Sequence, residues 1–280
     1  MSTIDRDPQA KAEPAPGSAA DPFRYGWRHV VRKQPDGRVE LEQVPLTLED
    51  LLFPEEGDFT VQYRSHIEDC LYLKMIFDFR LAREAEAVVT CDCRVDWNLP
   101  GVRPLGPDVA VFLGVPRDHD PGTLRVARAG VRPVVVVEVT SPDTRKNDLG
   151  IKKGFYERAR VPYYVVVDAR PGGERRRVKL LGFRHAPGGY EPMPLDDRGR
   201  LRLEPLGIWL AIADGRVVGL DGETGEPIVG YVELAQSRAE AEARADVAEA
   251  RSGADAIARA DLEARLREME AELRRLRGEG

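Results

Sequence analysis

Residues 133–168 read PVVVVEVTSPDTRKNDLGIKKGFYERARVPYYVVVD, and this stretch decides the fold that we predict. It begins with a run of β-branched residues, 134–139, which is typical of a strand buried on both faces. A helical pattern follows over about 147–160, and a second apolar run, 163–167, predicts another strand. Strand, helix and strand in about 35 residues form a βαβ unit, whose strands are parallel and whose crossover is right-handed.

The first of these strands carries one acidic residue, Glu138. Side chains alternate along a strand, so Glu138 shares a face with Val136 and Thr140. Burying a carboxylate without a partner is costly. Glu138 therefore requires a cation, a metal ion or several hydrogen-bond donors.

The helix that follows carries polar residues at a regular spacing. Asp148, Lys152 and Tyr156 are four residues apart, so they line up on one side of the helix. We expect them beside an apolar stripe that packs on the sheet. That stripe consists of Ile151, Phe155 and Ala159.

A second acid belongs to the same pattern. Pro107 and Asp108 directly precede an apolar run, 109–113, that predicts a neighbouring strand. The full pattern is Asp108, then Glu138 some thirty residues later, then a lysine in the next helix. This combination is far more specific than Pro-Asp alone.

This combination resembles the PD-(D/E)XK phosphodiesterases and, more closely, the Uma-type family of proposed restriction endonucleases. The resemblance extends from about Trp27 to Glu233. It rests on Pro107-Asp108, on residues 138–142, on Asp148, Lys152 and Tyr156, and on residues 161–164 with Asp168. It implies an α/β nuclease-like core, with a mixed sheet, flanking helices and the βαβ unit at the site.

The resemblance also implies roles for these residues. Asp108 and Glu138 would hold Mg²⁺ or Mn²⁺, hard cations that take oxygen ligands, with the Val139 carbonyl as a further oxygen. In the parent motif a lysine lies two residues after the Glu, where this chain has Thr140. By resemblance Lys152 takes its place and orients the attacking water. Asp148 and Tyr156 would support it, and Lys153, about 100° away around the helix, is the weaker candidate.

A longer helix is predicted from Tyr63 to about Ala87, packed on the sheet through a stripe at spacing four. This stripe consists of Ile67, Leu71, Met75 and Phe79. By resemblance, His66 or Glu68 of this helix could assist the metal site. The alternative is an ordinary hydrogen-bonded or surface residue.

Three other patterns predict local structure. Residues 89–97 alternate as one strand, with Cys91 and Cys93 on the same face, and 46–52 predict a short helix with a capping box. Five short strands between 178 and 220, separated by Asp-Gly and similar turns, predict a meander that extends the sheet. The three cysteines, an odd number without Cys-x-x-Cys spacing, are expected to be free thiols.

The chain divides into three parts. Residues 1–22 are rich in Ala, Pro and Asp and predict a disordered tail, and 23–231 form the nuclease-like domain. Residues 232–280 predict a long helix and a coiled coil, which would pair with a second copy or with a partner. The alternative is a solvated single helix. The coiled-coil seam, at spacing 4-3-4-3, is Leu262, Leu266, Met269, Leu273 and Leu276.

Composition limits the function classes. The net charge is −6, and no apolar run approaches the roughly 20 residues of a membrane span, so we expect no membrane partner. The N-terminus lacks a signal-peptide pattern, which favours a cytoplasmic location. The family resemblance implies a Mg²⁺-dependent endonuclease acting on DNA, or alternatively on RNA or nucleotides. The rival hypothesis is a catalytically inactive nuclease fold that binds partners through its coiled coil.

Overall fold

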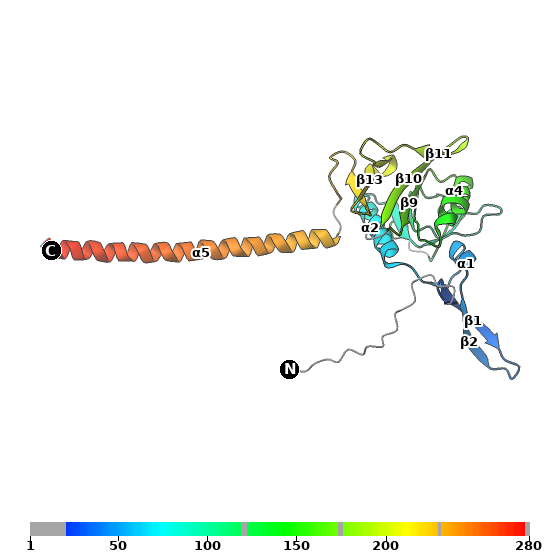
Figure 1. Ribbon diagram of the computed structural model, residues 1–280, viewed down its shortest axis with the longest axis horizontal. Coiled ribbons are helices and arrows are strands. Elements are labelled where there is room, and N and C mark those ends of the chain that lie inside the picture. The colour runs from blue at the N-terminus through cyan, green and yellow to red at the C-terminus, as the bar shows by residue number, and fades with distance from the viewer. Residues whose placement is uncertain (1–20, 119–121, 173–175, 229–230, 278–280) are drawn as a thin grey trace. The chain divides into compact units, whose positions relative to one another are not determined.

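The computed structural model describes residues 21–118, 122–172, 176–228 and 231–277 (Figure 1). It does not describe the side chains at 231–238, 250, 254–257 and 276. Nearly all of the predicted tail also lies outside the described residues. The chain forms two compact units, one ending at Ile228 and one beginning at Val229. The predicted boundary lies at 231/232.

A six-stranded mixed sheet organises the first unit, in the order β11-β10-β9-β8-β6-β4. Its only parallel pair joins β8 to β9, with Val135 opposite Tyr163 and Val139 opposite Val167. The predicted βαβ unit is therefore present. The strands are β4 (Ala87–Cys91), β6 (Val109–Leu113), β8 (Val135–Val139), β9 (Tyr163–Arg170), β10 (Arg177–Ala186) and β11 (Gly189–Met193).

Both faces of the sheet are covered, which explains why β8 is apolar along its length. Val135, Val137 and Val139 join the core cluster that contains α2 (Arg64–Arg80). Val136 joins a second cluster on the opposite face, together with Tyr156. A strand buried on both sides needs β-branched residues in succession rather than in alternation.

The stripe predicted to pack α2 on the sheet was wrong at three of its four positions, whereas the fourth, Met75, packs against the core. Ile67, Leu71 and Phe79 are exposed, whereas Leu73 and Phe77 are fully buried. The helix also ends at Arg80, several residues before the predicted end. Because α2 carries apolar residues on more than one side, spacing alone did not determine which side packs on the sheet.

The predicted strand 89–97 was also wrong, because it breaks in two. Asp92 has a φ of 52°, the left-handed region, and its N–H donates to the carbonyl of Asp108. After this turn, β5 (Arg94–Asp96) leaves the main sheet and pairs in parallel with β7 (Thr123–Arg125). Cys91 and Cys93 therefore do not share one strand.

The crossover helix is irregular. It starts as a π-helix, η1 (Asn147–Lys152), and continues as α4 (Lys153–Arg158). Ile151, predicted to be buried, is about half exposed, whereas Asp148, Lys152 and Tyr156 are buried. Insertions of this kind alter which side of a helix faces the core and are frequent at functional sites.

The predicted meander is divided between two sheets. β10 and β11 extend the main sheet, but the remaining strands form a separate sheet in the order β12-β13-β14. These strands are β12 (Leu201–Leu203), β13 (Ile208–Ala213) and β14 (Arg216–Asp221), with a short 3-10 helix, η2 (Glu204–Leu206), before β13.

Before α2 the chain forms a small sheet, β2-β1-β3, and a short helix. The capping box predicted for that helix, α1 (Leu48–Leu52), is confirmed: the Thr47 hydroxyl accepts from the Asp50 N–H, and the Asp50 carboxylate accepts from the Thr47 N–H. The strands are β1 (Gly26–Lys33), β2 (Val39–Pro45) and β3 (Phe59–Thr60), and another short helix, α3 (Val126–Ala129), follows β7.

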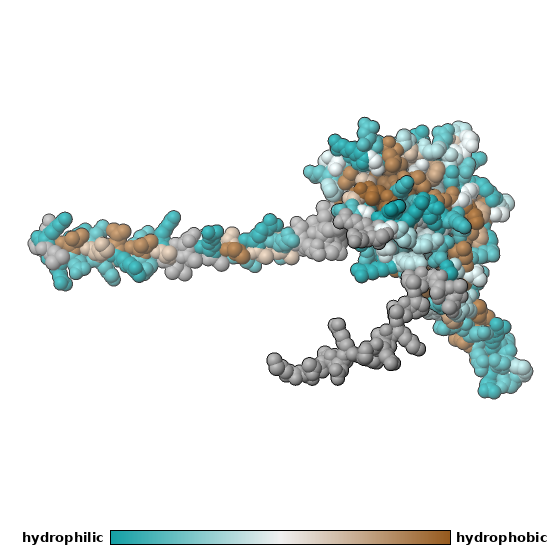
Figure 2. All heavy atoms as spheres, viewed as in Figure 1, coloured by the Kyte–Doolittle hydropathy of each residue, from teal (hydrophilic) through white to brown (hydrophobic). Residues whose placement is uncertain are grey.

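The second unit consists of one long helix, α5 (Tyr231–Leu276). Leu262, Leu266, Met269 and Leu273 of the predicted seam are about half exposed or more, and Figure 2 shows apolar side chains along this part of the helix. Among the described residues, no helix is both long enough and apolar enough to cross a membrane.

Candidate active site

Asp108, Glu138 and Lys152 meet at one end of the sheet, although they are far apart in the sequence. The Lys152 Nζ donates to Glu138 Oε2 at 2.9 Å, and the Asp108 N–H approaches the same oxygen at 3.4 Å. The Asp108 carboxylate accepts the N–H of Val139, the residue after Glu138, at 2.7 Å. The three residues are therefore connected by direct hydrogen bonds.

The charges in this cluster are unbalanced. Asp108, Glu138 and Asp148 are all buried carboxyl groups, and Lys152 is the cation between them. Burial raises the pKa of Asp108 to about 7, although the Lys152 charge opposes this shift. Burial likewise raises the pKa of Glu138. For Lys152, burial would lower the pKa, but the charges of Glu138 and Asp148 outweigh burial and raise it.

The second Glu138 oxygen is bound by a tyrosine that packs among other aromatic rings. The Tyr156 hydroxyl donates to Glu138 Oε1 at 2.5 Å, and the Tyr156 ring packs against Trp97 and Tyr164. The Tyr164 hydroxyl in turn donates to the backbone carbonyl of Asp148 at 2.6 Å. Ring packing and the Tyr156 hydroxyl group thus fix the orientation of the Glu138 carboxylate.

Asp148 holds Lys152 from the other side. Its Oδ1 lies 3.2 Å from the Lys152 Nζ, and its Oδ2 accepts from the Thr144 hydroxyl at 2.9 Å. Spacing along the sequence predicted the alignment of Asp148 with Lys152. Thr144 was not predicted as part of the site, although it lies four residues before Asp148.

Thr140 occupies the position of the missing motif lysine and has a structural role. Its hydroxyl donates toward the Ala169 carbonyl and accepts the Ala169 N–H, which ties β8 to β9. Asp168 beside it is bound by Arg145 and Arg170. Burial would raise the pKa of Asp168, but the hydrogen bonds from Arg145 and Arg170 outweigh burial and lower it to about 2.

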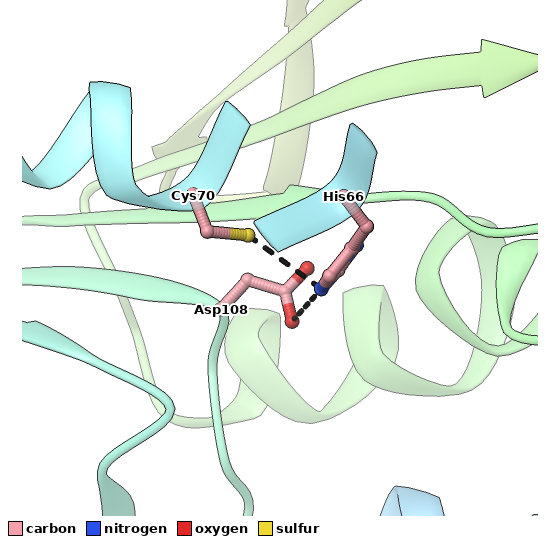
Figure 3. A group of neighbouring side chains, drawn as sticks. All are labelled: His66, Cys70 and Asp108. Atoms are coloured by element: carbon pink, nitrogen blue, oxygen red, sulfur yellow. Dashed lines mark hydrogen bonds and ion pairs between the residues drawn. The ribbon is translucent and has the colours of Figure 1, made fainter. Parts of the chain in front are cut away.

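His66 lies on the opposite side of Asp108. Its Nδ1 is 2.9 Å from the Val139 carbonyl oxygen, and its Nε2 is 3.6 Å from Asp108 Oδ1 and 3.5 Å from Cys70 Sγ. Figure 3 shows His66 and Cys70 extending from α2 toward Asp108. Glu68, the alternative residue predicted to assist the metal site, instead pairs with Arg64 and Arg216 at the surface.

All three cysteines are free thiols, as predicted, and Cys70 is buried. What sequence reasoning missed is that Cys70 contacts His66 and lies beside Asp108. The four-residue spacing of His66 and Cys70 on one helix was the available signal. It could not reveal that Asp108, from a distant strand, completes the group.

A cavity of about 720 Å³ opens beside the cluster. His66, Asp108 and Lys152 line it, whereas Glu138 is fully buried behind them. Seven acidic side chains line the cavity, against three arginines and Lys152. The three arginines are Arg24, Arg64 and Arg94. Four of the acids that line the cavity are paired with arginines: Asp143 with Arg24, Glu55 and Asp58 with Arg28, and Glu56 with Arg94.

Several basic side chains outside the cavity are engaged within the protein. Arg145 binds Asp168, Arg176 binds Asp69, and Lys153 lies over the ring of Phe183. Their charges are therefore partly neutralised. The three cavity arginines are paired as well, Arg24 with Asp143, Arg64 with Glu68 and Arg94 with Glu56.

The fold and the site define a mixed α/β protein with a buried acid-lysine centre. The sequence profile of the Uma2 family, described as "Putative restriction endonuclease", matches residues 64–213, more than half of the chain. The chain belongs to this family, as the sequence motifs predicted.

Among solved structures, the chain is similar to one titled as a "putative nuclease" from Anabaena variabilis ATCC 29413. The two share 12% sequence identity over 58% of this chain and 91% of the other, with a TM-score of 0.40. No curated protein matches the chain.

Proposed function

We propose that this protein is a Mg²⁺-dependent endonuclease of the PD-(D/E)XK type that hydrolyses phosphodiester bonds in DNA. One observation carries this proposal: Asp108, Glu138 and Lys152 come from three separate segments and converge beside a cavity, where Glu138 accepts hydrogen bonds from both of the others. Membership of the Uma2 family supports it.

The donor set fits a hard divalent cation. Asp108, just before β6, and Glu138, in β8, supply carboxylate oxygens, and the Val139 carbonyl oxygen lies 2.9 Å from His66 Nδ1. Burial raises the pKa of Asp108 and of Glu138, and a divalent cation bound to both carboxylates would offset the cost of keeping them ionised. Asp108 and Glu138 would hold Mg²⁺ or Mn²⁺, which supplies Lewis acidity toward the phosphate and a more acidic bound water.

The chain's own residues position the remaining groups. Lys152, held by Glu138 and Asp148, presents a fixed positive charge toward the cavity, where it can orient a water molecule and offset charge on the phosphate. Tyr156 keeps the Glu138 carboxylate in place. His66 supports Asp108 from the α2 side.

Plasmid cleavage by the purified full chain in the presence of Mg²⁺ tests the proposal. We expect Asp108→Asn and Glu138→Gln to lower the rate by at least about 100-fold, whereas Glu191→Gln, an exposed control on β11, retains it. RNA of the same sequence, offered in parallel, tests the choice of DNA. Cleavage retained in both site variants would reject the assignment.

The rival hypothesis, an inactive module, predicts a different result in the same experiment. Calorimetry with Mn²⁺ separates the two, because an enzyme loses its binding heat on Glu138→Gln. An inactive module gives neither heat nor cleavage.

We also propose that α5 pairs with α5 of a second copy, parallel and in register. In the predicted seam, Leu266 and Leu273 take heptad position a, and Leu262 and Met269 take position d. In a parallel pair, each g residue faces the e residue five positions later in the other chain. These pairs are Arg265 with Glu270 and Glu272 with Arg277, both of opposite charge.

Two charge-conserving variants test this pairing in the full chain. Arg265→Glu with Glu272→Arg, and separately Glu270→Arg with Arg277→Glu, turn both pairs into like-charge pairs without altering composition. By analytical ultracentrifugation we expect the wild type to dimerise and each variant alone to be monomeric. An equimolar mixture of the two variants should recover the dimer. A monomeric wild type, or variants that dimerise as well as the wild type, would contradict the proposal.

A further inference from the structure

His66, Cys70 and Asp108 form a second donor set beside the proposed Mg²⁺ ligands. The imidazole nitrogens of His66, the sulfur of Cys70 and a carboxylate oxygen of Asp108 offer one ligand atom each, all within 4.8 Å of one another. All three side chains are buried, and they point toward a common centre (Figure 3). This set contains nitrogen and sulfur, which Mg²⁺ does not favour.

The hydrogen bond of His66 Nδ1 determines whether the other ring nitrogen, Nε2, has a lone pair available for a metal ion. The Val139 carbonyl can only accept, so His66 Nδ1 carries the proton of that 2.9 Å hydrogen bond. In a neutral imidazole, Nε2 therefore presents a lone pair toward Asp108 Oδ1 and Cys70 Sγ. Metal-binding histidines commonly have this arrangement, in which the second nitrogen donates to a carbonyl that fixes the ring.

Two of the three separations between the ligand atoms match those around a tetrahedral ion, and the third is within 4.8 Å. With the usual zinc bond lengths to nitrogen, sulfur and oxygen, tetrahedral geometry places S and N about 3.6 Å apart and N and O about 3.4 Å apart. The observed separations are 3.5 Å between Cys70 Sγ and His66 Nε2, and 3.6 Å between His66 Nε2 and Asp108 Oδ1. An imidazolium-carboxylate hydrogen bond would instead shorten the second distance to about 2.7–2.9 Å.

We propose that His66, Cys70 and Asp108 bind Zn²⁺ or a similar late first-row divalent ion. His66 and Asp108 line the cavity, so the fourth coordination position is open to water or to a substrate oxygen. The thiol of Cys70 loses its proton to the solvent when the metal-sulfur bond forms. This site shares Asp108 with the proposed Mg²⁺ ligands but does not depend on cleavage activity.

Cobalt(II) is the probe, because it takes the geometry of zinc and absorbs light. The reduced, tag-free full chain is titrated with Co²⁺ in the absence of oxygen. We expect about one equivalent to produce tetrahedral d–d bands and a near-ultraviolet sulfur-to-cobalt charge-transfer band. Zn²⁺ should displace the signal, and Mg²⁺ should not, because Mg²⁺ is a poor competitor for sulfur and nitrogen ligands.

Two variants assign ligands, and a third is the control. Cys70→Ser, nearly isosteric, should lose the charge-transfer band, and His66→Gln should weaken Co²⁺ binding by at least about tenfold. Cys93→Ser is the matched control and keeps the band, since Cys93 is outside the donor set. Near-ultraviolet circular dichroism confirms that each variant is folded.

One further variant distinguishes the proposed His66-Cys70-Asp108 metal site from the proposed nuclease activity. Glu138→Gln should abolish Mg²⁺-dependent cleavage and leave the cobalt-thiolate band intact. A wild type without a charge-transfer band at any Co²⁺ concentration, or a band unchanged in Cys70→Ser, would overturn the metal site whatever the outcome of the cleavage assay.

Discussion

Lys152→Met removes the cation that two buried carboxylates share. The Lys152 Nζ lies 2.9 Å from Glu138 and 3.2 Å from Asp148, and both acids are at most 1% exposed. Met is similar in length and unbranched, so it preserves most of the packing while deleting the charge. The variant therefore measures the cost of leaving the acids unpaired.

Removing one partner of a buried ion pair costs about 3–5 kcal/mol of unfolding free energy, and we expect a loss in this range. The loss should decrease as the pH falls, because protonation then neutralises the carboxyl groups and removes the penalty. Burial raises the pKa of Glu138, so this relief begins at a higher pH than for an exposed glutamate.

Urea denaturation followed by tryptophan fluorescence measures the loss. The three tryptophans, Trp27, Trp97 and Trp209, all precede Ile228, so the signal reports on the first unit. Lys153→Met is the matched control: this neighbouring ammonium lies 4.1 Å from the Phe183 ring, a contact worth about 0.5–1 kcal/mol at a partly exposed site.

A double-mutant cycle with Glu138→Gln isolates the interaction energy between Lys152 and Glu138. We expect the double variant to be more stable than the sum of the single losses predicts, by up to about 3 kcal/mol. Added Mg²⁺ should restore part of the stability of Lys152→Met, because a bound cation replaces the ammonium. A loss no larger than that of Lys153→Met, with no coupling to Glu138, would refute the reasoning.

Two further predictions concern stability away from Lys152. Asp168→Asn should cost about 2 kcal/mol at neutral pH, since the arginine partners of Asp168 lower its pKa to about 2 in the folded state. The lowered folded-state pKa stabilises the protein fully above about pH 4 and loses this effect as the pH falls toward 2. Urea titrations of both proteins across that range should therefore converge, and a constant difference would contradict the assignment. Gly182→Ala should cost about 1–3 kcal/mol, because its Cβ would lie 2.6 Å from a methyl group of the buried Leu201. Gly154→Ala, with open space at its Cβ, is the control and should be neutral or stabilising in thermal melts.

The βαβ unit could be predicted because its signals are local. A run of β-branched residues, a helical pattern and a second apolar run each specify one element, and short connections leave few ways to join them. The same run identified Glu138 as an acid in need of a partner. Asp108 followed from its position before another strand, together with the family resemblance.

The errors share a physical cause. α2 carries apolar residues on several sides, and its periodicity did not show that Leu73 and Phe77, rather than Leu71 and Phe79, pack on the sheet. The turn at Asp92 interrupts an alternating pattern that continues across it. In both cases local pattern was ambiguous, and packing against distant elements decided the result.

By itself, the sequence determined the family, the parallel strand pair and the chemical types that surround Glu138. Only the tertiary structure decided that Lys152 lies between two acids, that Glu138 lies behind the cavity wall, and that Cys70 contacts His66 beside Asp108. Periodicity specifies which residues share a face of their own helix or strand. Which face meets which partner depends on the packing of segments far apart in the chain, and the site is made of those contacts.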